Sequence, residues 1–377
     1  MLANDTFLRA CRGERTAYAP AWYMRQAGRY QPEYMAVRKR HSLLEICEQP
    51  ELCVQVTLLP VSQLGVDAAI LFSDIMVPLA PMGVDFRLEK DMGPIVEQPL
   101  QSADDIGRLR TLDPQEHLPH VLESVRLLAA ELTVPLIGFS GAPFTLASYL
   151  IEGGPSRDHL RTKTFMLREP AVWAQLMDKL ADMAVVYLRA QVAAGASAVQ
   201  LFDSWVGSLA REDFDRFVLP AVQKVFRELS ALGVPMIYFG VGASHLFSSI
   251  GSTGATVVGV DWRMGLSDAR RSLGGGVAAV QGNLEPAALL GPWDELRRRA
   301  SAVIADGRQE AGFVFNLGHG VPRYADVDTL RRLTDFVHES SAAAAGDARG
   351  EGPAMATGSA AARRPAPGRP SAAETGA

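Results

Sequence analysis

Residues 68–74, AAILFSD, place five apolar residues directly before a serine and an aspartate. A short uninterrupted apolar run of this kind is typical of a strand that is buried on both faces of a parallel sheet. Similar runs recur along the chain, at intervals that leave room for a helix between them. The predicted strands are Ala19–Met24, Ala68–Phe72, Pro135–Phe139, Ala198–Phe202, Pro235–Phe239, Thr256–Val260, Val277–Gln281 and Phe313–Asn316.

Segments with helical periodicity separate these runs. They cover Leu52–Leu64, Glu116–Leu132, Ala171–Ala194, Glu212–Leu232, Trp293–Asp306 and Asp328–Glu339. Strand–helix alternation repeated about eight times predicts an α/β fold, a single parallel (β/α)8 TIM barrel. The competing fold is a doubly wound open sheet, which carries a glycine-rich turn directly after a strand. The dense glycine run at 274–276 comes before a strand instead, so the sequence favours the barrel.

The composition is that of a globular protein with a large core. The chain has 377 residues, 48% of them hydrophobic and 21% charged, with a formal net charge of −5. This balance argues against general affinity for nucleic acid. Cys11, Cys47 and Cys53 form neither a disulfide framework nor a zinc motif, which indicates reduced thiols. The N-terminus lacks the pattern of a signal peptide, and no apolar run reaches the roughly 18–20 residues of a membrane span. We therefore expect a soluble cytoplasmic protein.

Two segments depart from the strand–helix pattern. Residues 84–98, VDFRLEKDMGPIVEQ, alternate apolar and polar residues around a turn, which predicts a small hairpin inserted after the second strand. From Ser341 the sequence is rich in alanine, glycine, proline and serine and has no aromatic residue. Such a sequence cannot bury enough surface to offset the entropy of ordering it. We predict a barrel domain at residues 1–340 and a disordered tail at 341–377, an inert extension and not an interaction segment.

Polar or glycine-rich clusters follow almost every predicted strand. In a barrel the carboxyl ends of the strands converge on one face, and this face carries the active site. The clusters are residues 25–29, 73–74, 140–143, 203–205, 240–245, 261–263, 282–283 and 316–320. An aspartate such as Asp203 or Asp261 can be explained as a helix N-cap. Two arginines and a histidine are less well explained in this way, so we expect these clusters to surround one pocket.

Arg25 and Arg29 are candidates for binding an anionic ligand. On a helical turn, two residues four apart would share a face, and guanidiniums bind carboxylates bidentately. Taken alone, such a pair is more often a solvated surface feature, but here it directly follows a strand and encloses a glycine. Asp74 ends the 68–74 run, where a helix cap and a functional acid are equally good explanations.

Histidine and serine residues add weaker signals. His319 lies between glycines in NLGHG, which allows a ligand to approach the backbone closely, and it could act as an acid or base or only as a hydrogen-bond donor. His117 and His120 resemble a metal pair, but Pro119 lies between them and no third ligand is near, so we expect surface residues. Ser204 is not within a G-x-S-x-G motif, which disfavours a serine hydrolase.

Several of these clusters belong to longer motifs. PAWYMRQAGRYQPEY (20–34) and GFSGAPFTLASYLIEGG (138–154) resemble two signatures of the uroporphyrinogen decarboxylase family. AILFSDIMVPLAPMG, QLFDSWVGSL, YFGVGASHL, VGVDWR, VQGNLEP and FNLGHGVP match this family in the same order. The resemblance spans nearly the whole chain to about residue 340. It implies a homodimeric (β/α)8 barrel that works without a metal or an organic cofactor.

The resemblance also implies an activity and a set of site residues. The activity is removal of carbon dioxide from the four acetate side chains of uroporphyrinogen III, which gives coproporphyrinogen III in heme biosynthesis. The implied catalytic residues are Asp74, Arg25 and Arg29. The implied substrate-binding residues are Arg25, Gln26, Ala27, Gly28, Arg29, Asp74, Tyr149, Ser204 and His319.

Two features of the sequence depart from the family pattern, and two other functions compete with this interpretation. Leu44 stands where family members typically have a phenylalanine that lines the pocket, and the loop after His319 has its proline earlier than usual. A zinc- and corrinoid-linked methyltransferase would share the barrel, but it needs thiolate ligands and no cysteine follows Cys53. A non-catalytic tetrapyrrole carrier could use the same pocket, but it would not need Asp74, Tyr149 and His319 together.

Overall fold

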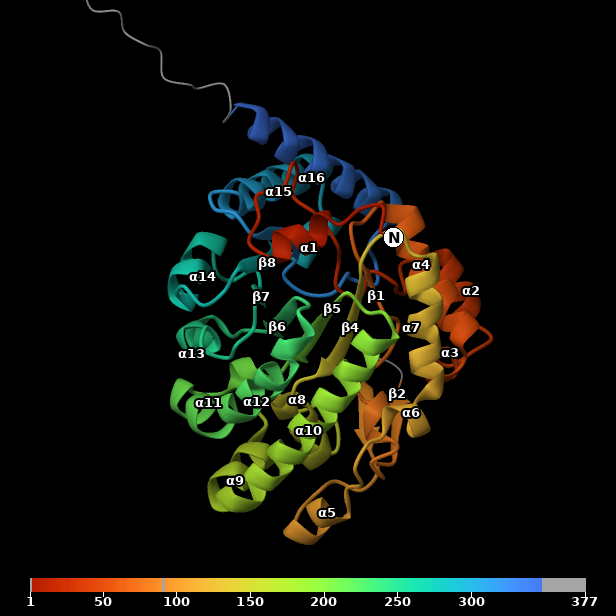
Figure 1. Cartoon of the computed structure of the whole chain (residues 1–377), viewed down its shortest axis with the longest axis vertical. Coiled ribbons are helices and arrows are strands. Elements are labelled where there is room, and N and C mark those ends of the chain that lie inside the picture. Colours follow the sequence, from red (N-terminus) through yellow and green to blue (C-terminus); the bar gives the residue numbers. More distant parts are fainter. Residues whose placement is uncertain (1, 90–91, 348–377) are drawn as a thin grey trace, which may run out of the picture.

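The computed structural model of the chain describes residues 2–89 and 92–347. Its main sheet has seven strands in the order β1-β4-β5-β6-β7-β8-β9, and neighbouring strands are parallel. They are β1 (Ala69–Ile70), β4 (Leu136–Gly141), β5 (Ala198–Asp203), β6 (Met236–Gly240), β7 (Val257–Gly259), β8 (Ala279–Leu284) and β9 (Phe313–Leu317). Figure 1 shows the helices arranged around these strands. The predicted parallel α/β barrel is therefore confirmed.

An extended segment closes the barrel in place of an eighth strand. Residues 19–24, predicted as the first strand, form only one isolated bridge, between Ala21 and Phe315 of β9. The Phe315 amide donates to Pro20 O (2.8 Å), and on the other side the Asp67 amide donates to Ala21 O (2.8 Å). The prediction of a regular strand is wrong here, because Pro20 has no N–H to give to a ladder.

The buried carboxylate of Asp67 fixes this closure at the amino-terminal ends of the strands. Its Oδ2 accepts from Ala21 N (2.7 Å) and lies 2.7 Å from Nε2 of His338, on helix α16 (Val327–Asp347). Its Oδ1 accepts from the Tyr18 hydroxyl and from Asn4 Nδ2, both at 2.8 Å. One side chain thus joins the N-terminal segment, the closing segment and the last helix.

Three of the predicted helices are present close to their predicted bounds, as α4 (Pro50–Leu64), α10 (Pro170–Ala194) and α15 (Trp293–Gly307). The helix predicted at 328–339 is α16, which starts as predicted but continues to Asp347. The other two are each divided at a proline. The helix predicted at 116–132 is α6 (Pro114–His117) followed by α7 (Pro119–Glu131). The helix predicted at 212–232 is α11 (Arg211–Phe217) followed by α12 (Leu219–Leu229). Proline lacks the N–H that a helix interior needs but suits the first turn, so each proline starts a new helix.

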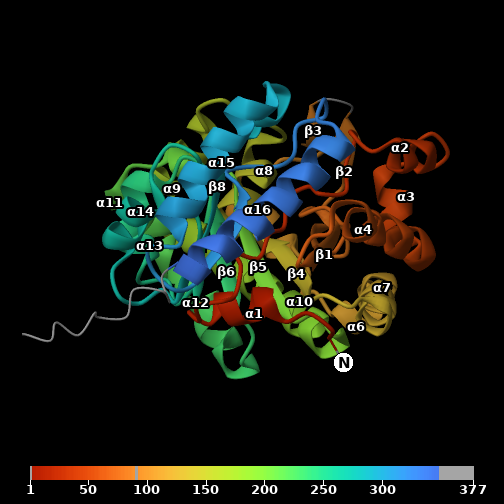
Figure 2. The same ribbon diagram turned by 90° about the horizontal axis from the view of Figure 1, so that it is seen from above.

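The remaining helices cover the outside of the barrel and its loops. They are α1 (Thr6–Cys11), α2 (Pro32–Arg38), α3 (Leu43–Glu48), α5 (Ala103–Arg108), α8 (Pro143–Glu152), α9 (Leu160–Arg168), α13 (Phe247–Ile250) and α14 (Leu266–Leu273). The predicted hairpin at 84–98 is confirmed as antiparallel β2 (Phe86–Glu89) and β3 (Gly93–Val96). In Figure 2, α2, α3 and the hairpin lie on the same side of the molecule.

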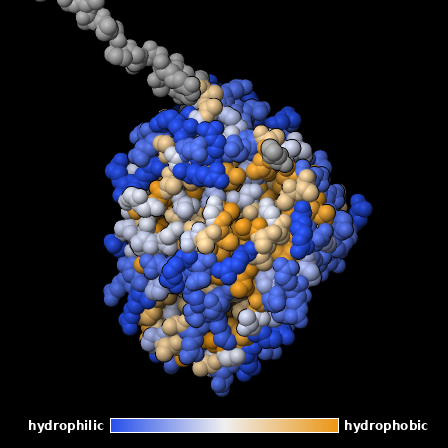
Figure 3. Space-filling model, in the orientation of Figure 1, coloured by the Kyte–Doolittle hydropathy of each residue, from blue (hydrophilic) through white to orange (hydrophobic). Residues whose placement is uncertain are grey.

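The molecular surface is mostly polar at its edges. On the face shown in Figure 3, hydrophilic residues form most of the periphery and hydrophobic residues gather toward the middle. Helix α16 includes Ser341, the predicted start of the disordered tail, whose hydroxyl accepts a 2.8 Å hydrogen bond from Ala19 N. The rest of the predicted tail, from 348, lies outside the described residues. Within the residues that are described, none of the helices is long and apolar enough to cross a membrane.

Candidate active site

The 25–29 loop follows the closing segment and is not helical. Arg25 has φ 58°, a left-handed conformation that is uncommon outside glycine and is often associated with functional sites. The premise that Arg25 and Arg29 share one face of a helical turn is therefore wrong. Both side chains are exposed on this loop.

Gln26 anchors the loop to the barrel. Its side chain is fully buried, with Oε1 accepting from Tyr23 N (3.1 Å) and Nε2 donating to Ala68 O (3.1 Å) at the entrance to β1. The Gly28 amide donates to Gln31 Oε1 (2.9 Å). Ala27 packs against a small apolar cluster next to α2 and α3. These three residues thus shape the loop that carries the two arginines.

The loop after β9 packs directly against Arg25. The Met24 amide donates to Asn316 Oδ1 (3.2 Å), and the Val321 amide donates to Met24 O (2.9 Å). A Cβ atom added to Gly320 would lie only 2.5 Å from Arg25 Cδ, so glycine is required for this approach. As a result His319 lies beside Arg25, although the two are far apart in the sequence.

Asp74 ends the turn after β1 and is partly exposed. Its Oδ1 accepts from the Met76 amide (2.9 Å), so it caps the following turn. Burial raises the pKa of Asp74, while the Met76 N–H and the positive charge of Arg25 act in the opposite direction. The structure thus supports both explanations of Asp74: it is a cap, and its carboxylate faces the field of Arg25.

Tyr149 reaches the same region from α8. Its ring lies edge-on to Trp205 with centroids 5.9 Å apart. Burial first, and then the charge of Asp74, raise the pKa of Tyr149 to about 12, so it is a neutral hydroxyl at physiological pH. Ser204 precedes Trp205 in the turn after β5 and is partly exposed.

Asp203, considered as a helix N-cap, instead holds α8 in place from inside the barrel. Its Oδ1 accepts from the Thr145 hydroxyl (2.6 Å) and its Oδ2 from the Tyr238 hydroxyl (2.7 Å). Burial raises the pKa of Asp203 to about 6, against the lowering effect of these two hydrogen bonds. Because Thr145 is on the same helix as Tyr149, Asp203 fixes the position of Tyr149 relative to the strands.

His319 is neutral in this setting. Burial, followed by the charges of Arg25 and Arg263, lowers the pKa of His319 to about 4. Its Nδ1 accepts from the Gly320 amide (2.7 Å), which leaves Nε2–H as the donor of the neutral ring. Of the two roles open for His319, hydrogen-bond donor fits this environment better than general acid.

Arg263 was not among the predicted site residues, although its cluster at 261–263 was noted. It belongs to the loop between β7 and α14, and its guanidinium pairs with Asp261 Oδ2 (2.6 Å). Asp261 also accepts from Gly242 N (2.6 Å) and Arg263 N (2.9 Å), so it joins two loops and does not cap a helix. Two sequence signals point to this cluster, its position after a strand and its place in the VGVDWR motif.

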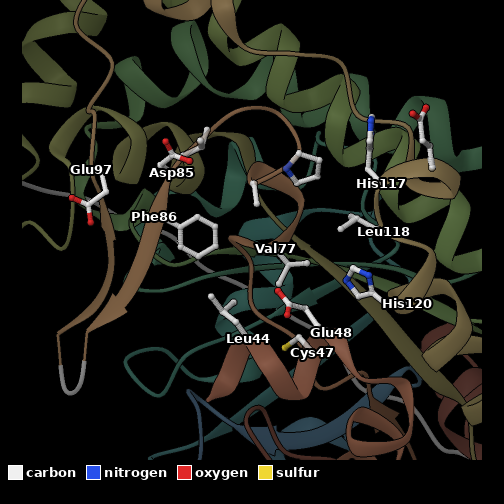
Figure 4. Close-up of a pocket in the computed structure, with 14 residues that line it drawn as sticks. Leu44, Cys47, Glu48, Val77, Asp85, Phe86, Glu97, His117, Leu118 and His120 are labelled. Atoms are coloured by element: carbon white, nitrogen blue, oxygen red, sulfur yellow. The ribbon is translucent and has the colours of Figure 1, made fainter. Parts of the chain in front are cut away.

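A cavity lies beside this site and not within it. It has a volume of about 650 Å³ and lies between α3, the 77–81 turn, the β2–β3 hairpin and the α6–α7 junction (Figure 4). Leu44, the departure from the family noted above, is on its wall. The lining residues are Leu44, Cys47, Glu48, Val77, Ala80, Pro81, Val84, Asp85, Phe86, Glu97, Glu116, His117, Leu118 and His120. We call it the side cavity; none of the nine predicted site residues lines it.

His117 and His120 both line the side cavity and are partly buried, so the expectation of plain surface residues holds only in part. His117 Nδ1 accepts from Asp113 N (3.0 Å), and burial lowers the pKa of His120. Among the described residues there is no group of three or more His, Cys, Asp or Glu side chains that could hold a metal ion.

Comparisons with known proteins agree with this arrangement. A family model described as "Uroporphyrinogen decarboxylase (URO-D)" matches residues 2–340. A uroporphyrinogen decarboxylase of Bacillus velezensis is 56% identical over 341 residues, which cover 90% of this chain and 96% of that protein. One of Geobacillus thermodenitrificans is 54% identical, covering 89% of this chain and 97% of that protein.

Among solved structures, a methyltransferase from Methanosarcina mazei has a TM-score of 0.71 at 20% identity, covering 88% of this chain and 97% of that one. At this identity the likeness concerns the fold alone. The family match spans the full set of predicted site residues. The chain therefore belongs to the uroporphyrinogen decarboxylase family.

Proposed function

We propose that the chain decarboxylates the four acetate side chains of uroporphyrinogen III to give coproporphyrinogen III. The observation that carries this proposal is that Asp74, a partly buried carboxylate, lies in the field of Arg25, on a loop fixed to the same end of the barrel. The substrate has eight carboxylates around its rim and four pyrrole N–H groups at its centre. The site offers the complementary charges in that arrangement.

The arginines of the 25–29 loop bind carboxylates of the substrate. A guanidinium presents several donors in one plane, which matches a carboxylate with two parallel hydrogen bonds. The left-handed backbone at Arg25 and the contact of its side chain with Gly320 fix where this group lies before the substrate arrives. Such preorganisation lowers the entropy that binding must overcome.

Asp74 acts as an anion on the pyrrole N–H groups. An ionised carboxylate only accepts hydrogen bonds, so it can collect several of these N–H groups at once. Protonation of a pyrrole carbon makes the ring cationic, and this ring takes up the electron pair released when the C–C bond to the carboxylate breaks. The CH2 left on the ring then takes up a proton to become a methyl group, and the ring carbon gives its proton back, so each acetate consumes one proton and releases one carbon dioxide. A fixed anion stabilises this cationic state more than the neutral substrate, which lowers the barrier.

Tyr149 and His319 supply neutral donors near these charges. The raised pKa of Tyr149 keeps its O–H, and the lowered pKa of His319 keeps its ring neutral with Nε2–H available. Neutral donors can hydrogen-bond substrate carboxylates without adding a titrating charge close to Asp74. Ser204, partly exposed in the adjacent turn, is placed with them as a binding residue.

The first experiment is an anaerobic incubation of the purified chain with uroporphyrinogen III, followed by chromatographic separation of the products by carboxylate number. We expect coproporphyrinogen without added metal or organic cofactor. Tight binding without loss of carbon dioxide would favour a tetrapyrrole carrier instead. Stoichiometric zinc in the purified protein, together with methyl transfer, would favour the methyltransferase alternative.

Two further parts of this function are proposed with it: assembly as a homodimer and a cytoplasmic location. The first is tested by the solution mass from light scattering, where a mass of one chain would contradict it. The second is tested by fractionating cells that express the tagged protein.

A further inference from the structure

The loop between β7 and α14 brings a third exposed arginine to the site. We propose that Arg263 binds a carboxylate of the substrate on the opposite side of His319 from Arg25, away from the acetate that reacts. It would thereby set affinity and orientation without taking part in the chemical step. The proposal rests on the proposed function and names a further binding residue for it.

The backbone around Arg263 is held rigidly. Asn283 on β8 donates from Nδ2 to both Asp261 O (2.9 Å) and Met264 O (2.5 Å). The Asp261 carboxylate, which is almost fully buried, accepts from the amides of Gly242 and Arg263. These bonds fix both ends of the short segment that carries the arginine, so its position is set before any ligand binds.

The guanidinium itself is oriented but only partly used. It lies 4.1 Å from the ring centroid of Trp262, which restrains its plane, and Nη1 donates to Asp261 Oδ2. Within residues 2–89 and 92–347, the other N–H groups of this guanidinium have no hydrogen-bond partner, and the side chain is 48% exposed. A guanidinium with a fixed plane and an open edge is suited to receive a carboxylate.

Contacts of the loop after β9 place His319 between the two arginines. A Cβ atom on Gly318 would lie 2.5 Å from Trp262 N, and one on Gly320 would lie 2.5 Å from Arg25 Cδ. The residue between these glycines is therefore flanked by the 261–263 segment on one side and by Arg25 on the other. The charges of both arginines lower the pKa of His319, in agreement with this placement.

Arg263 and Asp74 lie at different parts of the barrel rim. Arg263 is on the loop after β7, and three strands separate β7 from β1, which Asp74 follows. The segment that leads to Arg25 lies beside the start of β1, since the Asp67 amide donates to Ala21 O. An anchor away from Asp74 suits a carboxylate that stays on the substrate while another one leaves. A second anchor, separated from the 25–29 loop, also restricts rotation of a substrate whose carboxylates surround the whole ring.

The test uses the full chain and three variants. R263Q removes the charge, R263K keeps a charge but removes the planar fork, and R332Q is the matched control. Arg332 on α16 is also exposed and lies 3.8 Å from the ring centroid of Trp293, outside the barrel. For each protein we would measure kcat and KM with uroporphyrinogen, the Tm, and the Kd for coproporphyrinogen by anaerobic titration of tryptophan fluorescence.

We expect R263Q to raise KM and the product Kd by about ten- to a hundredfold, the range for a lost charge-assisted hydrogen bond. The kcat should stay within about threefold, R263K should lie between R263Q and the unchanged protein, and R332Q should change neither constant. A KM within twofold of the unchanged value would overturn the proposal. A fall in kcat and Tm with KM unchanged would assign Arg263 to loop structure only.

The outcome is separable from the proposed function. If the unchanged protein forms no coproporphyrinogen, the proposed function fails whatever the variants do. If it does form coproporphyrinogen and R263Q binds substrate and product normally, only the role of Arg263 fails. If R263Q does not fold, the KM and product Kd of R263K are measured instead. Raised values would support the proposal, and unchanged values would overturn it.

Discussion

The candidate site and the side cavity lie close together but carry opposite charges. The loops of the candidate site carry the exposed side chains of Arg25, Arg29 and Arg263, whereas Glu48, Asp85, Glu97 and Glu116 line the side cavity. Two residues of the cavity wall, Cys47 and Val77, also contact the candidate site. The charge of Asp74 contributes to the raised pKa of Cys47, and Val77 N donates to Asp74 O (3.2 Å). The cavity has a volume of about 650 Å³, yet its charge is wrong for a polycarboxylate.

By the sign of its local charge, the candidate site suits an anionic ligand better than the side cavity does. The net charge of −5 gives no general attraction for an anion, so local guanidiniums must provide it. Among the four acids of the side cavity, only Glu97 has an ion-pair partner in the described chain, namely Arg87. A substrate with eight negative charges would be repelled by the other three.

The largest expected effect is that of removing the charge at Asp74. In D74N the amide oxygen of the new side chain can still accept from the Met76 amide, so the turn and the fold should be kept. We expect kcat to fall by about a hundred- to a thousandfold, as for the loss of one preorganised electrostatic group. Anaerobic kinetics together with the Tm would measure this. A D74N variant with near-normal kcat would refute charge stabilisation by Asp74.

The next effect concerns the 25–29 loop. R29A removes an exposed guanidinium from the proposed carboxylate anchor, so we expect KM to rise by about ten- to a hundredfold, with reduced turnover. R332Q serves again as the control for loss of one exposed arginine. Unchanged kinetics in R29A would mean that Arg29 is only a surface residue. Arg25 and Arg263 would then be the remaining candidates for binding the substrate carboxylates.

A smaller effect is expected in the pH dependence of kcat/KM. Asp74 must be ionised to act, and burial raises its pKa above the ordinary value, so activity should fall with decreasing pH at a higher pH than an ordinary aspartate would give. Arg25 opposes this rise. In R25Q the pKa of Asp74 should therefore rise further, and the acidic limb should move to higher pH.

The matched variant for this pH profile is R263Q, because Arg263 is on the loop after β7, which three strands separate from β1 and Asp74. Its acidic limb should coincide with that of the unchanged protein. Profiles of kcat/KM for the three proteins, measured with the same substrate, cancel the titration of the substrate's own carboxylates. If R25Q and R263Q shifted the acidic limb of the kcat/KM profile equally, the shift would not come from a specific effect of Arg25 on the pKa of Asp74.

The smallest effect is expected in the side cavity. E116Q and L44F change its charge and its volume without altering any residue of the candidate site. We expect kcat and KM for uroporphyrinogen to stay within about twofold, since surface substitutions away from special features have small effects. A large change in KM for either variant would mean that the substrate enters the side cavity, and the comparison would have to be reversed.

Much of the fold could be predicted from the sequence, because the signals are local. Apolar runs such as 68–72 and the helical periodicity of α10 depend on neighbouring residues, and the barrel follows from their alternation. The failures also have local causes. The helices predicted at 116–132 and 212–232 ignored the stop that Pro119 and Pro220 impose on the preceding turn.

The site was predictable in position and in part in composition. The sequence was sufficient to name four candidate residues, Arg25, Asp74, Tyr149 and His319. The signals were the family resemblance and their positions after strands or within motifs. The sequence could not show that Arg263 is fixed by Asp261, because an aspartate two residues before an arginine is explained equally well as a cap. That choice depends on Gly242 and Asn283, which other strands bring to the same loop.

By itself the sequence determined the barrel, the family and the residues that carry charge at the carboxyl ends of the strands, since these follow from pattern and order along the chain. The tertiary structure alone decided how the charges act. Packing gave Arg25 its left-handed backbone, made His319 neutral between two guanidiniums, and separated the basic site from the acidic cavity. The burial of a residue and the electric field that acts on it depend on neighbours that are distant in the sequence. Both are therefore set only when the chain folds.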